Sequence, residues 1–454
     1  MIEGLKPHAE YKESGLPWAS RIPAHWSLIP NRAVLKKRKV LVGSKHGNYR
    51  LLSLTKGGVI VRDISTGKGK FSSDMGTSQE VRKGDFVFCL FDVPETPRTV
   101  GLSTHDGMIT SAYTVFESKR LSPEGVRFLE RFYLAMDDQK LLSPLYSGLR
   151  HTIPPPRFLG TKTPQPPPDE QAAIVRFLEH ANRKIDGFIR AKRKLIGLLN
   201  EQKQAIIHRA VTRGLDPDVP LKPSGIPWLG DIPKHWEVRR AKYLLREVDD
   251  RSKEGKETHL AMSQRLGLVP SSMVESAMRS ESYAGAKLCQ EGDLVLNRLK
   301  AHLGVFALAK QGGVISPDYS VFRKRAAISM EYYESVLRSS ACRRELRIRA
   351  KGLVEGFWRL YTDDFYDIRL PVPPLDEQKE IMSAVTVETA ALTTAIARTE
   401  REIALMQEYR TRLTADLVTG KLDVREAAAK LPASPSEAAP DEPLEETETE
   451  EIDA

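Results

Sequence analysis

The sequence predicts an α+β protein in which two mixed α/β globular domains form a tandem pseudo-repeat and are joined by two long antiparallel coiled-coil helices. The first observation is a long segment of helical periodicity that occurs twice, each time after a Pro-Pro-x-Asp-Glu-Gln motif. Asp169 and Asp376 are 207 positions apart, and so are Asp216 and Asp423 near the segment ends. The second observation is that motifs of the globular regions recur at separations that drift between 206 and 210. A fixed register indicates rigid rods, whereas drift places small insertions in loops, where recognition usually occurs.

The two predicted helices occupy residues 166–216 and 373–425. Prolines prevent each helix from extending upstream, and the carboxylates of Asp169–Glu170 suit the first turn, where free N–H groups and the helix dipole favour negative charge. A glycine follows each helix as a suitable stop, at Gly214 and Gly420. At 1.5 Å per residue, each helix is about 65 Å long.

Apolar residues in both helices follow alternating steps of three and four, which is typical of a coiled-coil seam. One helix cannot bury such a stripe alone, so we expect the two stripes to pack against each other. The alternative is two separate helices on two separate cores. The seam residues are Ile174, Leu178, Ala181, Ile185, Phe188, Leu195, Leu199 and Ile206 in the first helix, and Ile381, Val385, Leu392, Ile403, Met406, Leu413 and Leu417 in the second.

The globular domains are predicted at residues 1–165 and 217–372, and each begins with a Gly-x-Pro-Trp motif followed by Ile-Pro-x-His-Trp. The first domain has His25 in this motif and the second has His235. Each histidine is interpreted as a packed or capping imidazole beside a tryptophan, because no acid or thiol recurs at a fixed distance to complete a nucleophilic site. Further on, a Gly-Asp turn leads into a buried strand in both copies, at residues 84–85 and 292–293. The approach to the first helix is proline-rich, which leaves the domain edge near residues 155–168 open.

Composition indicates an ordinary globular protein with more than one domain. The chain has 454 residues, of which 41% are hydrophobic and 28% charged. It has no run of eighteen apolar residues and no signal-peptide pattern at its start, so we expect a cytoplasmic protein without a membrane segment. Three cysteines without CxxC spacing suggest neither disulfides nor a zinc site. Cys89, in an apolar run, is interpreted as a buried structural thiol.

Charge is distributed unevenly along the chain. The net charge is +9, yet residues 431–454 contain nine acidic residues and no lysine or arginine, so the remainder carries +18. Such a basic body indicates a polyanionic partner, and nucleic acid fits better than a membrane because no lipid-binding amphipathic element stands out. Residues 426–454 are predicted to be a disordered acidic tail.

The sequence favours binding over catalysis. It contains no GxxxxGK[ST], HExxH or GxSxG motif and no Asn-Pro-Pro-Tyr motif for gripping a flipped base. Basic residues interleaved with aromatic residues and glycines can neutralise phosphates and reach base edges. The runs Lys36–Lys39 and Arg190–Lys194 are denser, although such runs are usually solvated helix faces. The candidate DNA-binding residues are Arg62, Lys68, Lys70, Arg98, Arg150, Arg298, Lys300, Arg347, Arg349, Lys351, Trp358 and Arg359.

These doubled motifs make the sequence, over about residues 11–425, similar to the specificity subunits of type I restriction-modification systems. The resemblance implies that each globular half is a target-recognition domain for one half of a split DNA site. It also implies that the helices form a spacer and a docking surface for two methyltransferase (modification) subunits, which carry S-adenosylmethionine. Restriction/translocase subunits that use ATP and Mg²⁺ join such assemblies. No cofactor is expected in this chain. The docking residues expected on the helices are Leu178, Ile185, Phe188, Leu195, Leu199, Ile206, Leu392, Ile403, Leu413 and Leu417.

The geometry of DNA supports the same arrangement. Duplex DNA has dyads perpendicular to its axis, so two related domains present equivalent surfaces best around a pseudo-twofold, which makes the helices antiparallel. Since the loops differ, we expect an asymmetric target whose unread spacer is set by helix length. Two alternatives remain: a self-sufficient DNA methyltransferase or nuclease with an unrecognised site, and a non-catalytic coiled-coil scaffold without sequence preference.

Overall fold

A computed structural model describes residues 5–62, 75–263, 266–274, 282–352 and 358–432. The predicted tail beyond Pro432 and the candidate residues Lys68 and Lys70 lie outside these ranges. The chain divides into two compact units. Unit 1 comprises residues 1–191 and 401–438, and unit 2 comprises residues 192–400 and 439–454. Within the described residues, no helix has the length and apolar character that crossing a bilayer requires.

The globular part of unit 1 is built on a four-stranded antiparallel sheet in the order β4-β11-β8-β9. Val115 of β11 lies at its centre, opposite Val87 of β8 and Arg38 of β4. The elements before the first long helix are β1 Tyr11–Leu16, β2 Ala19–Pro23, β3 Ser27–Pro30, α1 Asn31–Val34, β4 Leu35–Arg38, η1 Gly43–Asn48, β5 Leu52–Thr55, β6 Gly58–Val61, η2 Met75–Thr77, β7 Gln79–Val81, β8 Phe86–Phe88, β9 Val100–Leu102, β10 Gly107–Ile109, β11 Thr114–Ser118, α2 Pro123–Asp138, η3 Ser143–Leu145, α3 Pro155–Gly160 and β12 Lys162–Gln165.

Unit 2 repeats this plan with the sheet order β16-β23-β20-β21. Val321 of β23 lies opposite Val295 of β20 and Val248 of β16. Its elements are β13 Leu221–Pro223, β14 Asp231–Pro233, β15 Glu237–Arg240, α5 Ala241–Leu244, β16 Leu245–Val248, β17 Leu260–Ser263, β18 Gly267–Pro270, η4 Ser271–Met273, β19 Lys287–Cys289, β20 Leu294–Asn297, η5 Arg298–Leu303, β21 Phe306–Leu308, β22 Gly313–Ile315, β23 Tyr319–Lys324, α6 Met330–Arg338, α7 Ser340–Arg349, α8 Thr362–Tyr366 and β24 Arg369–Val372.

Local chemistry explains why these segments adopt their structures. The strand β8 has the fully buried sequence Phe-Val-Phe, which is typical of a central strand covered on both faces. The helix α2 begins with proline at its first turn, and the Ser122 hydroxyl accepts a hydrogen bond from the Gly125 N–H at 3.1 Å. In unit 2, Ser329 caps α6 in the same way through the Tyr332 N–H.

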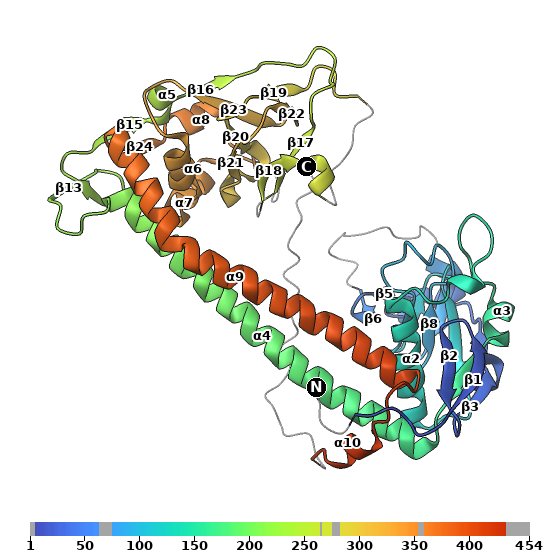
Figure 1. The fold of residues 1–454 in the computed structure, drawn as a ribbon. Helices are drawn as coiled ribbons and strands as arrows, with labels where there is room; N and C mark the ends of the chain where they lie inside the picture. Colours follow the sequence, from blue (N-terminus) through green and yellow to red (C-terminus); the bar gives the residue numbers. More distant parts are fainter. Residues whose placement is uncertain (1–4, 63–74, 264–265, 275–281, 353–357, 433–454) are drawn as a thin grey trace. The chain divides into compact units, whose positions relative to one another are not determined.

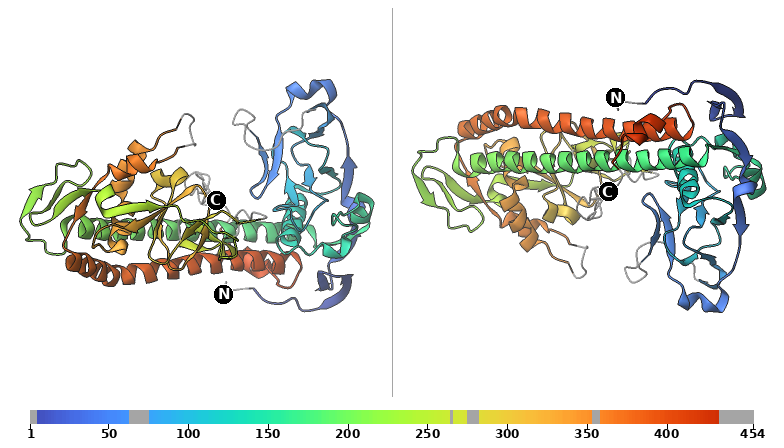
Figure 2. Two further views of the ribbon diagram at one scale, coloured as in Figure 1. Left: turned by 90° about the horizontal axis from the view of Figure 1, so that it is seen from above. Right: turned by 90° about the horizontal axis from the view of Figure 1, so that it is seen from below.

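The two long helices are α4 (Pro168–Arg213) and α9 (Leu375–Val418), drawn in green and red in Figure 1. In unit 2 they run antiparallel, because Lys203 donates to Thr393 at 2.9 Å and Arg209 pairs with Glu388 at 3.4 Å. Both views of Figure 2 show the unit 1 portions of the two helices side by side. There Asp186 pairs with Arg410, before the short helix α10 (Arg425–Ala429). The predicted α+β class with two long antiparallel helices is confirmed.

Each globular core includes helix residues from both α4 and α9. In unit 1, Trp26, Phe116 and Phe128 pack in one cluster with Leu178 of α4 and Leu417 of α9. In unit 2, an equivalent cluster contains Trp236 and Phe322 together with Val211 of α4 and Ile381 of α9. Each domain therefore rests on the start of one long helix and the end of the other.

Candidate nucleic-acid interface

The doubled sequence motifs form one interlocking contact in each unit. In unit 1, the Trp26 indole N–H donates to Glu170 Oε1 at 3.0 Å, and His25 Nε2 lies 2.7 Å from Glu170 Oε2. In unit 2, Trp236 and His235 contact Glu377 at 3.0 Å and 2.8 Å. Each histidine therefore bonds to a carboxylate in the first turn of a long helix, and the adjacent tryptophan shares that carboxylate.

The two Gly-Asp turns also hold equivalent ion pairs. Asp85 accepts the Arg82 backbone N–H at 2.7 Å and pairs with Arg38. Asp293 accepts the Gln290 N–H at 2.8 Å and pairs with Arg323. Arg38, which belongs to the dense basic run Lys36–Lys39, is thus engaged within the sheet rather than presented to a ligand.

On this scaffold, unit 1 carries a short hairpin whose Ser147 and Thr152 exchange backbone hydrogen bonds of 2.9 and 3.0 Å. At its tip, Leu149 is 100% exposed. Arg150 pairs with Asp92, and its guanidinium lies 5.6 Å from the centre of the Phe91 ring. We name this group hairpin cluster 1; it consists of Phe91, Asp92 and Ser147–Thr152.

Unit 2 has a hairpin at the same place, in which Lys351 and Arg359 exchange backbone hydrogen bonds of 2.9 and 2.8 Å. The Leu360 N–H donates to the Arg298 carbonyl at 3.0 Å, just as the Ile153 N–H donates to the Leu90 carbonyl at 2.8 Å in unit 1. In each unit a backbone hydrogen bond therefore joins the residue after the hairpin to the segment that follows β8 or β20. We name this group hairpin cluster 2; it consists of Arg298, Asp318, Lys351, Trp358 and Arg359.

Aspartates hold the basic side chains of hairpin cluster 2 in place. Asp318 pairs with Arg359 through its carboxylate and accepts from Arg298 Nε through its carbonyl at 3.0 Å. Lys351 pairs with Asp364 at 2.7 Å. Beside the cluster, the Arg347 guanidinium lies 5.7 Å from the centre of the Trp358 ring. The structure thus brings Arg298 together with four predicted residues of the 347–359 segment in one basic, aromatic surface.

Other predicted residues have structural surroundings. Arg98, whose side chain is 18% exposed, pairs with Asp137 at 3.3 Å and Asp138 at 2.7 Å. Because two carboxylates hold it, its geometry argues against a base contact. Arg349 forms a pair with Glu345 one helical turn away, at 2.8 Å.

Arg62 and Lys300 complete the described candidates. Arg62 follows β6 and donates its backbone N–H to the Leu51 carbonyl at 2.8 Å. Lys300 lies in η5, two residues after Arg298, with a non-helical backbone. Neither Arg62 nor Lys300 belongs to hairpin cluster 1 or hairpin cluster 2.

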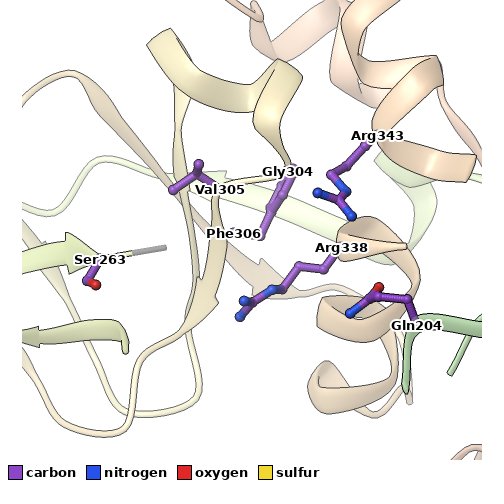
Figure 3. Close-up of a pocket in the computed structure, with 7 residues that line it drawn as sticks. All are labelled: Gln204, Ser263, Gly304, Val305, Phe306, Arg338 and Arg343. Carbon is purple, nitrogen blue, oxygen red and sulfur yellow. The ribbon is translucent and has the colours of Figure 1, made fainter. Parts of the chain in front are cut away.

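Sequence reasoning missed two arginines that line a cavity of about 130 Å³ in unit 2. Figure 3 shows Arg338 of α6 and Arg343 of α7 on the same side of this cavity, near Gln204 of α4. Burial lowers the pKa of Arg343, and the neighbouring charge of Arg338 adds to this effect. At Gly304, which has φ +71°, a Cβ would lie 2.3 Å from Arg343 Cδ. The dense arginine pattern of residues 338–349 was the sequence signal that could have drawn attention to this pair.

The predicted docking residues of the helices differ in exposure. Leu178, Ile185, Leu413 and Leu417 are buried, whereas Leu195 is 40% exposed. The remaining ones, which are partly buried, are Phe188, Leu199, Ile206, Leu392 and Ile403. In unit 1 the helices also line an apolar groove of about 460 Å³, whose walls include Phe177, Ile185, Phe188, Met406, Tyr409 and Leu431.

No known protein-family model matches the sequence. The fold matches a chain in a structure that describes complex assembly and conformational transition of the type I restriction-modification system, with 15% identity, 87% of this chain and 98% of that chain covered, and a TM-score of 0.54. Two further matches are the HsdS subunit from Thermoanaerobacter tengcongensis (15% identity, 88% and 98% covered, TM-score 0.39) and the type I restriction-modification S subunit from M. genitalium (13% identity, 87% and 96% covered, TM-score 0.34). The chain therefore has the fold of a chain found in a structure of the type I restriction-modification system.

Proposed function

We propose that this chain is the non-catalytic DNA-recognition subunit of a type I restriction-modification assembly and reads a bipartite, asymmetric site with its two globular domains. The observation that carries the proposal is the pair of hairpin clusters. They occupy equivalent places on two copies of one scaffold, tied by the same backbone hydrogen bond, yet they present different side chains. Equivalent placement fits two half-sites, and different side chains fit two different sequences.

The charge of the chain supports a nucleic-acid partner. Residues 1–430 carry +18, while the nine acidic residues after position 430 bring the net charge to +9. Lysine and arginine on a basic surface neutralise phosphates and release counterions, which gives affinity for any duplex. Specificity then comes from arginine and aromatic contacts to base edges, which the two hairpin clusters can supply.

The helices are the proposed docking site for two modification subunits, which would supply S-adenosylmethionine, and for restriction subunits that would use ATP and Mg²⁺. The apolar groove of unit 1 supports this role, since contiguous exposed apolar surface marks binding sites. Replacing Phe188 or Tyr409 of the groove with aspartate should abolish co-purification of a modification subunit. The same variants should still bind DNA, because neither residue belongs to a hairpin cluster.

The decisive experiment is to map methylated positions in the genome of cells that carry the complete system. A split motif with two unlike halves and an unread spacer is expected. Exchanging residues 30–150 for those of a related chain should change one half only. Two results would overturn the proposal: methylation or cleavage of DNA by the purified chain alone, which indicates an enzyme, or equal binding to all duplexes at physiological salt, which indicates a scaffold.

A further inference from the structure

The His8 imidazole in unit 1 is buried, with 6% of the residue exposed, and among the described residues neither ring nitrogen has a hydrogen-bond partner. Its Nε2 lies 3.7 Å from Glu170 Oε1, and its Nδ1 lies 3.9 Å from Asp423 Oδ2. Both separations exceed the usual hydrogen-bond length of about 2.7–3.2 Å. A buried polar group without a hydrogen-bond partner loses its bonds to water and gains none within the protein, which destabilises the fold. The burial of this ring therefore requires an explanation.

The atoms around His8 have the spacing of a metal site. His8, His25 and Glu170 each offer one ligand atom, and these atoms lie within 4.8 Å of one another. His25 Nε2 and Glu170 Oε2 are 2.7 Å apart. Around a tetrahedral zinc ion with bonds of about 2.0–2.1 Å, neighbouring ligand atoms are about 3.3 Å apart. The separations between ligand atoms, from 2.7 Å to at most 4.8 Å, bracket this value. Small side-chain rotations therefore suffice to bring the three atoms onto one ion.

The electrostatics of the cluster favour a cation. A neutral imidazole has one N–H donor, and if it points from Nδ1 toward Asp423, the Nε2 lone pair faces a carboxylate oxygen of Glu170. Two acceptors then face each other, and a metal ion between them removes that repulsion.

The neighbours of the three side chains are those that metal ligands usually have. The Trp26 N–H holds Glu170 Oε1 at 3.0 Å, and Asp423 lies beside the outer nitrogen of His8. Metal-binding histidines commonly direct their second nitrogen at a carboxylate, and metal-binding carboxylates are commonly hydrogen-bonded. The His25 side chain is 39% exposed, which leaves a path for an ion and for a water ligand.

Unit 2 provides a natural comparison. It repeats the contacts of histidine and tryptophan with a helix carboxylate at His235, Trp236 and Glu377. Among its described residues, no third histidine, cysteine or acid completes a group of three ligand atoms. The position 210 residues after His8 is Asp218. His8 is thus an addition to a contact that folds without it.

We propose that His8, His25 and Glu170 bind one divalent transition-metal ion of the Zn²⁺ class, with water as the fourth ligand. The ion joins the N-terminal segment to the first turn of α4. Asp423 stands beside His8 and, through its backbone N–H, binds the Lys6 carbonyl at 2.7 Å, so the segment after α9 is held at the same point.

The test uses the untagged full-length chain, stripped with EDTA and titrated with Zn²⁺ against a chromophoric chelator. One ion per chain is expected. His8→Ala should weaken Zn²⁺ binding by more than about 100-fold, whereas Asp423→Asn, which removes only an outer partner, should weaken it by about 10- to 100-fold. The control variant His235→Ala should leave Zn²⁺ affinity unchanged. It removes the histidine of unit 2 that corresponds to His25, where no third ligand is present among the described residues.

Two further measurements separate binding from misfolding. Zn²⁺ should raise the thermal midpoint of the natural chain and leave that of His8→Ala unchanged, since a ligand stabilises only the state that binds it. Co²⁺ should give the visible absorption of a tetrahedral site in the natural chain alone. If the far-ultraviolet circular dichroism shows that His8→Ala does not fold, the same measurements are made on His8→Asn. A natural chain that binds no Zn²⁺, or a folded His8 variant that binds it equally well, would overturn the proposal.

Discussion

The tryptophans that follow His25 and His235, Trp26 and Trp236, are fully buried, and a helix carboxylate accepts each indole N–H. Glu377→Ala removes that acceptor and leaves the Trp236 N–H unpaired in the core of unit 2. We expect a loss of about 1–3 kcal/mol in the free energy of unfolding. Urea unfolding followed by tryptophan fluorescence measures it. Glu388→Ala, which breaks only the exposed pair with Arg209, should cost less than about 1 kcal/mol. Equal losses in the two variants would contradict this explanation.

Sequence reasoning at the residue scale found the repeated motifs but not their contacts. His25, Trp26 and Glu170 meet across about 145 positions, and recurrence alone does not say which motif touches which. His8 gave no signal because it occurs in one copy only. The basic residues were hardest to assign, since Arg98 and Arg150 look alike in sequence. In the structure two carboxylates hold an Arg98 side chain that is 18% exposed, whereas one carboxylate pairs with an Arg150 side chain that is 71% exposed.

All three cysteines should be unreactive in the native protein. Cys89, Cys289 and Cys342 are buried, and burial raises the pKa of Cys89, raises that of Cys289 to about 11, and raises that of Cys342. The thiolate is the reactive form, and it forms in a folded thiol only above that raised pKa. At pH 8 we expect almost no reaction with Ellman's reagent until denaturant is added, and then three thiols per chain. A thiol that reacts rapidly before unfolding would contradict the burial.

At the scale of elements, the helix ends offer a matched pair of substitutions. Gly420 and Gly214 follow α9 and α4 with φ of +76° and +77°. A Cβ on Gly420 would lie 2.3 Å from Pro23 Cδ, whereas for one on Gly214 the nearest described atom is Glu377 Oε1 at 3.4 Å. Gly214→Ala should cost about 1–2 kcal/mol from backbone strain alone. Gly420→Ala should cost more, because Pro23 must also move. Thermal unfolding of the two variants checks the order, and a smaller loss for Gly420→Ala would contradict it.

Counting apolar residues located the helix seam only in part. Leu195 is 40% exposed, while Ile189, Thr389 and Thr399 are buried. Threonine can occupy a seam because its hydroxyl bonds within its own helix; the Thr399 hydroxyl donates to the Ala395 carbonyl at 2.7 Å. A pattern that treats threonine as an interruption therefore misplaces the seam where the helices use small residues.

The hairpin clusters allow each half-site to be tested separately. If Arg150 and Arg359 contact bases, alanine at either one should cost about 1–3 kcal/mol of specific binding and relax one half of the target only. Arg209→Ala removes the same charge from a helix, so it should weaken binding to all sequences alike or not at all. Selection from a DNA library randomised in both halves, with the assembled complex, provides the measurement. Simultaneous relaxation of both halves by one variant would argue against separate readers.

At the scale of the whole molecule, the fixed separation of 207 residues follows from how the helices are used. Each unit contains the start of one long helix and the end of the other, and its core includes residues of both. A change of length in one helix would shift its pairing with the other, so both must keep the same length. Loops far from the paired helices do not affect this pairing, so their lengths can differ between the two copies.

A matched insertion in both helices tests whether they set the spacer of the proposed target. One heptad near Gly197 of α4 and one near Thr399 of α9 add about 10 Å of helix and keep the two helices paired. At 3.4 Å per base pair, the preferred spacer should lengthen by about three base pairs. Affinity should fall, because three base pairs also rotate the duplex by roughly a third of a turn.

Both half-site sequences should stay unchanged in this double insertion, because the hairpin clusters and their supporting ion pairs are untouched. The heptad in α4 alone is the control; it breaks the register with α9 and should destabilise the chain instead of lengthening the spacer. Sequencing of DNA methylated by the reconstituted complex reads spacer and half-sites together. An unchanged spacer would mean that the helices hold the domains without measuring the DNA, and an altered half-site would mean that recognition is not confined to the two clusters.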